Sequence, residues 1–110
     1  MPAIKIGDNV VTHINVFTVA PDRQLELVKS LTETVAAARK MPGWISASIH
    51  RSFDNRQVVN YVQFESHEAA AAVTKQLLSM GLIQRNTQID RVTPGQYEMV
   101  YTTTHEEMDE

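Results

Sequence analysis

The hydrophobic residues in the first part of the chain follow two different periods. Residues 10–19, VVTHINVFTV, are rich in β-branched side chains, which is typical of a strand. An apolar residue then recurs at every third or fourth position, which predicts an amphipathic helix of about eighteen residues beginning at Pro21. Met41-Pro42-Gly43 ends this helix, because proline cannot continue its hydrogen bonds. The apolar stripe of the helix consists of Leu25, Val28, Leu31 and Val35.

Two further strands are predicted over residues 44–53 and 57–65. Asp54-Asn55-Arg56 between them favours a tight reversal, so the two strands form a hairpin. The pattern allows a loop of two residues or of three. The choice matters because a shift of one residue exchanges the side chains on the two faces of the strand.

The remaining chain predicts a second helix and a last strand. Ser66 is a typical N-cap, and the helix after it carries four alanines, with its apolar face at Val73, Leu77 and Met80. Gly81 ends this helix, and a short extra helix is predicted over residues 83–91. After the turn Thr93-Pro94-Gly95, the alternation over residues 96–103 predicts a strand.

The order β-α-β-β-α-β predicts an α+β fold of the ferredoxin-like kind, with a four-stranded antiparallel sheet and both helices on one face. We expect one domain over residues 1–104, followed by an acidic tail at 105–110. The first three strands are apolar on both faces, so the helix-free face is predicted to pack against a second copy. The simplest closed arrangement is a homodimeric α+β barrel.

Composition and charge exclude several classes of protein. The chain has 110 residues and no cysteine, which excludes disulfide scaffolds and thiolate chemistry. Its net charge is −3, and four of its 13 acids lie in the last six residues, so the rest of the chain holds nine acids against ten bases. Without a basic stripe, nucleic-acid binding is disfavoured. No segment has the apolar length of a signal peptide or membrane span, so we predict a cytoplasmic protein with no membrane partner.

The sequence also lacks the motifs of common cofactor and hydrolase sites. Its four glycines are too far apart for a phosphate-binding loop, and no serine lies in a nucleophile elbow. None of the four histidines belongs to a ligand-spaced pair, so no metal site is predicted.

Polar residues inside apolar strands are the remaining candidates for chemistry. Asn15, Asn60, His13 and His50 all lie within predicted strands. A buried amide or imidazole without a hydrogen-bond partner costs on the order of 1–3 kcal/mol, so such residues indicate a pocket that binds a ligand. The other interpretation is that they lie at a barrel centre or a sheet edge, where water or another side chain satisfies them.

Three segments together resemble the antibiotic biosynthesis monooxygenase family. They are INVFTV at residues 14–19, MPGWISASIHRS at 41–52 and VVNYVQFES at 58–66, and the resemblance covers about residues 10 to 75. It implies a dimeric α+β barrel that works without a cofactor. In the branch that acts on aromatic polyketides, it implies oxidation of an anthrone or related phenol to a quinone by molecular oxygen.

The resemblance also implies roles for individual residues. Asn60 matches the asparagine of the family and is expected to donate a hydrogen bond to the substrate anion. A neutral histidine, His50 or His13, is expected to accept the proton, and we place His50 with Asn60 as the catalytic pair. The residues expected to bind the small aromatic or hydrophobic substrate are Asn15, Phe64, Trp44, His13 and Phe17.

The sequence departs from the family pattern at two places. Phe64 stands where the polyketide branch usually has tryptophan, and Ala69–Ala72 replace an aromatic residue that some members carry, which predicts a roomier pocket or a different substrate. These departures favour the alternative of a hydrophobic-ligand-binding dimer without oxygen chemistry, which includes a stress-related role. An isomerase or cyclase of the same fold is a third possibility. Haem degradation is disfavoured, because Thr74 stands where the haem-degrading members have their axial histidine.

Overall fold

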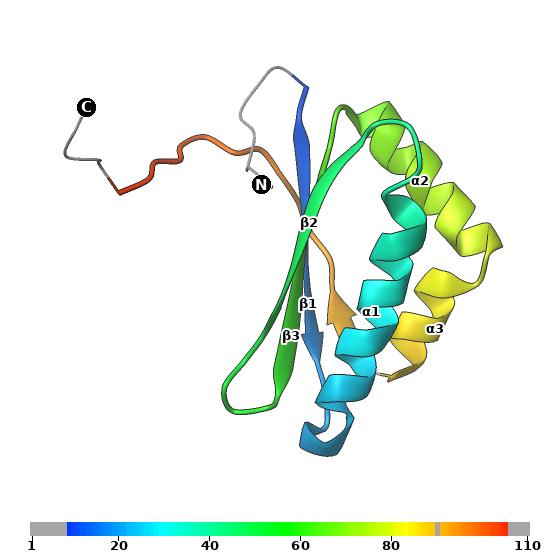
Figure 1. Ribbon diagram of the computed structural model, residues 1–110, viewed down its shortest axis with the longest axis vertical. Coiled ribbons are helices and arrows are strands. Elements are labelled where there is room, and N and C mark those ends of the chain that lie inside the picture. The colour runs from blue at the N-terminus through cyan, green and yellow to red at the C-terminus, as the bar shows by residue number, and fades with distance from the viewer. Residues whose placement is uncertain (1–8, 90, 106–110) are drawn as a thin grey trace.

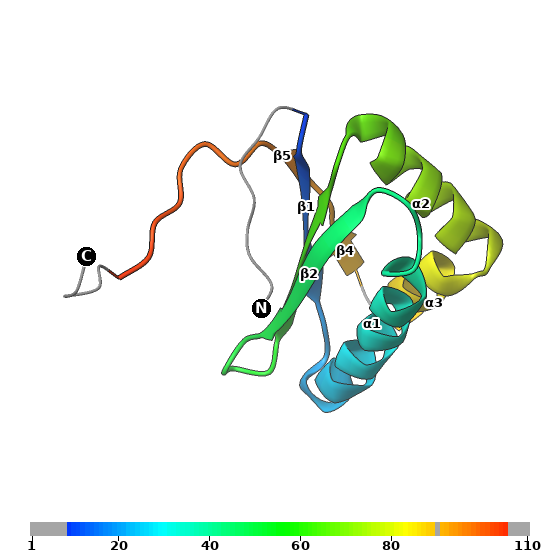
Figure 2. The ribbon, with the colours of Figure 1, turned by 45° about the horizontal axis from the view of Figure 1, so that its top comes forward.

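The computed structural model describes residues 9–89 and 91–105, which form an antiparallel sheet with helices against one face (Figure 1). A second view shows all of the helices on that same side (Figure 2). The predicted α+β, ferredoxin-like class is therefore confirmed. The strands are β1 (Val11–Thr18), β2 (Trp44–Arg51), β3 (Gln57–Phe64), β4 (Arg91–Thr93) and β5 (Gln96–Tyr97). The helices are α1 (Gln24–Ala38), preceded by the 3-10 helix η1 (Pro21–Arg23), α2 (His67–Ser79) and α3 (Leu82–Ile89).

The sheet has the order β2-β3-β1-β4, and β5 also pairs with β1. The edge beyond β1 is therefore made of two short pieces, so the described residues give five strands where four were predicted. The break falls at Pro94, which has no N–H to donate to the sheet. Next to it, the backbone N–H of Ile14 donates to the carbonyl of Gly95 at 2.9 Å, so the pieces stay aligned on the same strand.

The last strand is shorter than predicted. β5 ends at Tyr97, which pairs with Thr12, and β1 itself begins only one residue earlier, at Val11. Residues 98–105 therefore have no strand beside them; they are largely exposed and run away from the sheet (Figure 1, orange to red). The acidic tail predicted at 105–110 lies outside the described residues except for His105.

The register of the β2–β3 hairpin settles which side chains share a face. His50 pairs with Val59 and Ile49 with Asn60, so His50 and Asn60 point to opposite faces. β2 ends at Arg51, two residues earlier than predicted, and Phe53 is fully exposed in the loop. The loop turns at Asn55, whose φ is +67°.

A β-bulge at the start of β2 corrects a second expectation. The prediction that β2 is apolar on both faces requires Trp44 to lie on the face opposite Ala47 and Ile49. The pairing, however, shifts between Trp44 and Ser46, so that Trp44 lies opposite Phe64 while Ala47 lies opposite Val62. The extra residue at the bulge turns Trp44 to the helix-covered face. The helix-free face of β2 is therefore polar, and the prediction is wrong for this strand.

The buried face of α1 is rotated from the predicted stripe. Leu27 and Leu31 are buried, whereas Leu25 is 65% exposed. The cause lies at the start of the helix, where the buried Gln24 amide donates to the carbonyls of Ser52 and Gln57 at 3.1 and 2.9 Å. These bonds fix which side of α1 meets the sheet. Among the residues described, no helix has both the length and the apolar character needed to cross a membrane.

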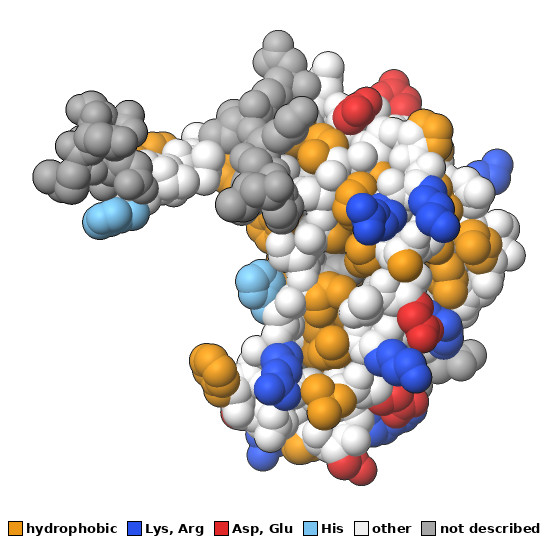
Figure 3. Space-filling view, viewed as in Figure 1, with side chains coloured by type: hydrophobic (Ala, Val, Ile, Leu, Met, Phe, Trp, Pro, Cys, Tyr) orange, Lys and Arg blue, Asp and Glu red, His pale blue; other side chains and the backbone are white. Residues whose placement is uncertain are grey.

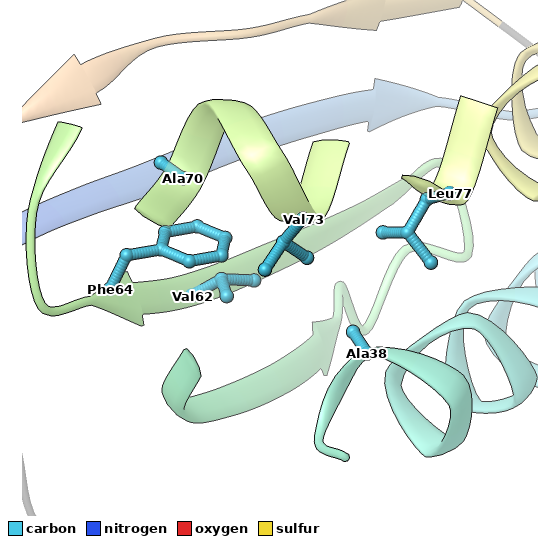
Figure 4. Packing of buried hydrophobic residues seen from close by; sticks show 6 residues of the cluster. All are labelled: Ala38, Val62, Phe64, Ala70, Val73 and Leu77. Atoms are coloured by element: carbon cyan, nitrogen blue, oxygen red, sulfur yellow. The ribbon is translucent and has the colours of Figure 1, made fainter. Parts of the chain in front are cut away.

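Buried apolar residues form two clusters between the sheet and the helices. One cluster joins β3 to α2, and the side chains of Phe64 and Val73 meet between these elements (Figure 4). Its members are Ala38, Val62, Phe64, Ala70, Val73 and Leu77. The other cluster holds α1 against the sheet and consists of Phe17, Val19, Leu27, Leu31 and Val58. Further hydrophobic side chains reach the surface, with Lys and Arg side chains around them (Figure 3).

A helix cap at Ser66 and a glycine at position 43 support the placement of α2. Ser66 caps the helix as predicted, since its hydroxyl accepts from the N–H of Ala69 at 3.0 Å. Gly43, which precedes β2, has a φ of +86°, and a Cβ there would collide with the Cβ of Ala69. Glycine therefore permits both the backbone conformation and the close approach of β2 to α2. Gly81, after α2, has a φ of +78° but open space around it.

These two glycines allow a matched test of the close approach. We expect Gly43→Ala to lower the free energy of unfolding by about 2–4 kcal/mol, because it adds a steric collision to the cost of the left-handed conformation. Gly81→Ala adds only the conformational cost, about 1 kcal/mol. Urea denaturation of both variants measures the difference, and equal losses would contradict the packing described for Gly43.

Candidate functional site

A cavity of about 610 Å³ lies between the helix-covered face of the sheet and the helices. Its walls come from β1, β3, the start of β2, all three α-helices and the β4–β5 segment. Most of the lining is apolar, and a few polar side chains point into it from the strands and from α2. A volume of this size and a lining of this kind suit a small organic molecule.

Two asparagines lie side by side on the sheet wall of the cavity. Asn15 and Asn60 occupy directly opposite positions of β1 and β3, and the Asn15 Nδ2 donates to the Asn60 Oδ1 at 2.8 Å. Asn60 is only 9% exposed. Because its carbonyl oxygen is taken by Asn15, its own amide N–H group remains to donate to a ligand. This arrangement suits an oxygen atom that carries negative charge.

His13 lies two residues before Asn15, on the same face of β1. Its ring is half-buried and meets the ring of Phe64 edge to face, with 5.0 Å between the ring centroids. The Nε2 atom is buried and has no hydrogen-bond partner among the residues that the structure describes. Burial, and to a lesser degree the nearby His67, lowers the pKa of His13 below its ordinary value of 6.5. The ring is therefore neutral at pH 7 and able to accept a proton.

Aromatic side chains form much of the remaining wall. Phe64 is 5% exposed, and Trp44 lies opposite it in the sheet. The Trp44 Nε1 is a second buried atom for which the described part of the chain offers no partner, so the wall holds a donor for a ligand. Across from these rings, α2 presents Ala70 and Ala71 to the cavity. These small side chains leave room between α2 and the aromatic wall.

The structure brings six of the seven residues proposed from the sequence to this one cavity. They are His13, Asn15, Phe17, Trp44, Asn60 and Phe64. It does not bring His50 there, because the hairpin register turns His50 to the helix-free face, where its side chain is exposed. The pairing of His50 with Asn60 in one site is therefore not found in this chain, and His13 takes the position beside the asparagines.

Sequence reasoning missed the residues that α2 contributes. His67, Thr74, Lys75 and Leu78 line the cavity together with Ala71. Among them, His67 is exposed and lies at the edge of the cavity. These positions recur at intervals of three and four, which places them on one side of a helix. That spacing was visible in the sequence, but nothing there showed which side of α2 meets a cavity.

A satisfied polar network fastens α3 over the cavity. The buried Asn86 of α3 contacts the Ser30 hydroxyl and donates to the Thr34 hydroxyl at 3.0 Å. Arg85 donates to Ser30 Oγ at 2.9 Å and pairs with Glu33 at 3.1 Å. Since Asn86 and Thr34 also line the cavity, this network holds one wall in place. Among the described residues, no group of three His, Asp or Glu side chains lies close enough together to hold a metal ion.

Comparison with known proteins gives this site a context. The tetracenomycin-F1 monooxygenase of Streptomyces glaucescens is 45% identical over 67 residues, which are 60% of this chain and 60% of that protein. SnoaB, a cofactor-independent oxygenase from Streptomyces nogalater, matches the fold with a TM-score of 0.77 at 21% identity, over 88% of this chain and 99% of its own.

A third relative was solved with a bound ligand. The monooxygenase from the ActVA-Orf6 gene of Streptomyces coelicolor, in complex with nanaomycin D, matches with a TM-score of 0.76 at 25% identity, over 87% of this chain and 92% of that one. The family model described as antibiotic biosynthesis monooxygenase matches residues 10–76, which is more than half of the chain and includes both asparagines and all of β3. This chain therefore belongs to the antibiotic biosynthesis monooxygenase family.

Proposed function

We propose that this protein is a cofactor-independent monooxygenase that oxidises a polycyclic phenolic or anthrone-like metabolite with molecular oxygen to a quinone. The observation that carries the proposal is the Asn15–Asn60 amide pair in a mainly apolar cavity, beside a neutral His13 whose Nε2 has no partner within residues 9–89 and 91–105. The names of the relatives, a tetracenomycin-F1 monooxygenase and a protein that binds nanaomycin D, support a substrate of this kind.

The reaction needs little from the protein once the substrate is an anion. His13 accepts a proton from the substrate, and the Asn60 amide donates to the oxygen that takes up the charge. Asn15 holds the Asn60 amide in the required orientation. The apolar walls exclude water, so the hydrogen bonds act in a medium of low dielectric constant.

The electrons for reduction of oxygen come from the substrate itself. In an anthrone, the methylene carbon loses two hydrogens and four electrons as it becomes a carbonyl, and O₂ accepts those four electrons. One oxygen atom becomes the new carbonyl oxygen, and the other leaves as water with the two protons. The balance closes without a metal, flavin or nicotinamide.

A second candidate function is binding of a small hydrophobic ligand without oxygen chemistry. It is favoured by Phe64, whose ring brings no hydrogen-bond donor to the cavity, and by the small side chains of Ala70 and Ala71. Oxygen uptake distinguishes the two functions, since a binding protein would be stabilised by the ligand and consume no O₂. A same-fold isomerase or cyclase would return a product of unchanged mass.

We also propose that the protein is a homodimer through its helix-free sheet face. Ile14 and Val16 of β1 and Val59 and Tyr61 of β3 alternate with the cavity-facing residues and so lie on that face. All four side chains are partly exposed within one chain. These four side chains form an apolar strip on a face whose neighbouring β2 residues, Ser46, Ser48 and His50, are polar, and such a strip favours a second sheet as its cover.

The role of Asn60 is tested by the oxidation of dithranol under metal-free conditions. We expect Asn60→Ala to lower kcat by about 100-fold, because a buried donor to the developing oxyanion is lost. Asn15→Ala should cause a smaller loss, since it only orients Asn60. His50→Ala should leave the rate unchanged because His50 lies on the other face. An unchanged rate in Asn60→Ala would refute the role of Asn60.

The protonation of His13 can be followed by NMR titration of its ring protons. We expect a midpoint below 6.5, and His67→Asn should raise it but leave it below 6.5, since burial is the larger cause. The unfolded chain then binds more protons in this window, so folding stability rises with pH up to about 6.5 and falls as the pH is lowered. A midpoint at or above 6.5 would contradict the buried environment of Nε2.

The homodimer is tested by light scattering of Ile14→Glu. A charge on the helix-free face should convert the dimer to a monomer, because a carboxylate cannot be buried between two apolar sheets without a large cost. Leu25→Glu is the control, since Leu25 is already 65% exposed on α1. A wild-type protein that is monomeric at all concentrations, or a dimeric Ile14→Glu variant, would rule out this interface.

A further inference from the structure

Among the described residues, the cavity lining has basic side chains but no acidic one. The described lining contains His13, His67 and Lys75 but no Asp or Glu. Lys75 has no ion pair with any residue that the structure describes, and its side chain is exposed at the edge of the cavity. Glu68, the neighbour of His67 in the first turn of α2, is exposed and does not line the cavity.

The exposed members of the lining mark where the cavity opens. They are His67, Ala71, Lys75, Leu78, Pro94 and Gln96, which come from one side of α2 and from the β4–β5 turn. A ligand that enters between these two elements passes Lys75. The mouth therefore presents a free ammonium group in front of an otherwise apolar cavity.

We propose that the natural substrate is an aromatic carboxylic acid whose carboxylate pairs with Lys75 at the mouth while its ring system fills the cavity. This inference rests on the proposed function and names the substrate class for the same site. The carboxylate stays at the mouth, partly in water, so its desolvation cost is small. Lys75 then selects the substrate and holds it in one orientation, with the reacting oxygen toward Asn60 and His13.

Binding of two inert probes tests the proposal without any oxidation. Anthraquinone-2-carboxylic acid and its neutral carboxamide have the same skeleton and differ in charge. We expect the wild-type protein to bind the acid roughly two- to fivefold more tightly by calorimetry, as a partly exposed ion pair gives. This preference should shrink as the salt concentration is raised.

Substitutions identify the group responsible. Lys75→Met should abolish the preference and Lys75→Glu should reverse it, whereas Lys29→Met should retain it, because Lys29 is an exposed lysine of α1 outside the cavity. Equal binding of the two probes by the wild-type protein, or a preference that survives in Lys75→Met, overturns the proposal. Dithranol carries no carboxylate, so its oxidation tests the proposed function separately from the role of Lys75.

Discussion

β1 and β3 pair without interruption from Val11 opposite Phe64 to Thr18 opposite Gln57, and the rest of the molecule is arranged around this ladder. Side chains alternate across a strand, so this single register sends His13 and Asn15 of β1 and Asn60 and Phe64 of β3 to the helix-covered face. It also places Ile14, Val16, Val59 and Tyr61 on the other face. A slip of one residue would remove the polar residues from the cavity and bury them on the apolar side.

Polar groups in the interior fall into two kinds with different consequences. The groups of Ser30, Thr34 and Asn86 bond to one another, and they hold α3 on α1. The Nε2 of His13 and the Nε1 of Trp44 have no partner in the described part of the chain. A buried polar atom without a partner costs free energy, on the order of 1–3 kcal/mol, which a bound ligand can recover. The first kind therefore builds the walls, and the second kind indicates where a ligand binds.

The composition of α2 connects the cavity to its entrance. The buried side of this helix, Ala70, Val73 and Leu77, packs against β3 (Figure 4). The neighbouring side carries His67, Ala71 and Lys75 at the edge of the cavity. Ala69 lets the helix lie close to Gly43, and Ala70 and Ala71 leave space in front of the aromatic wall. One helix thus limits the size of the ligand and sets the charge that the ligand meets on entry.

The sequence by itself determined the order of the main elements, the ferredoxin-like class and the family. These depend on local properties such as the strand period, the Ser66 cap, proline and glycine at element ends, and the motif around Asn60. It also named six residues that line one cavity, because polar residues in apolar strands stand out without any knowledge of their partners.

Only the tertiary structure decided which faces these residues occupy. The bulge turned Trp44 inward, the hairpin register turned His50 outward, and Gln24 rotated the buried face of α1 through bonds to Ser52 and Gln57. The last strand ended at Tyr97 because β1 offered no further partner. Each outcome depends on pairing or packing between segments far apart in the chain, and a local pattern carries no information about that alignment.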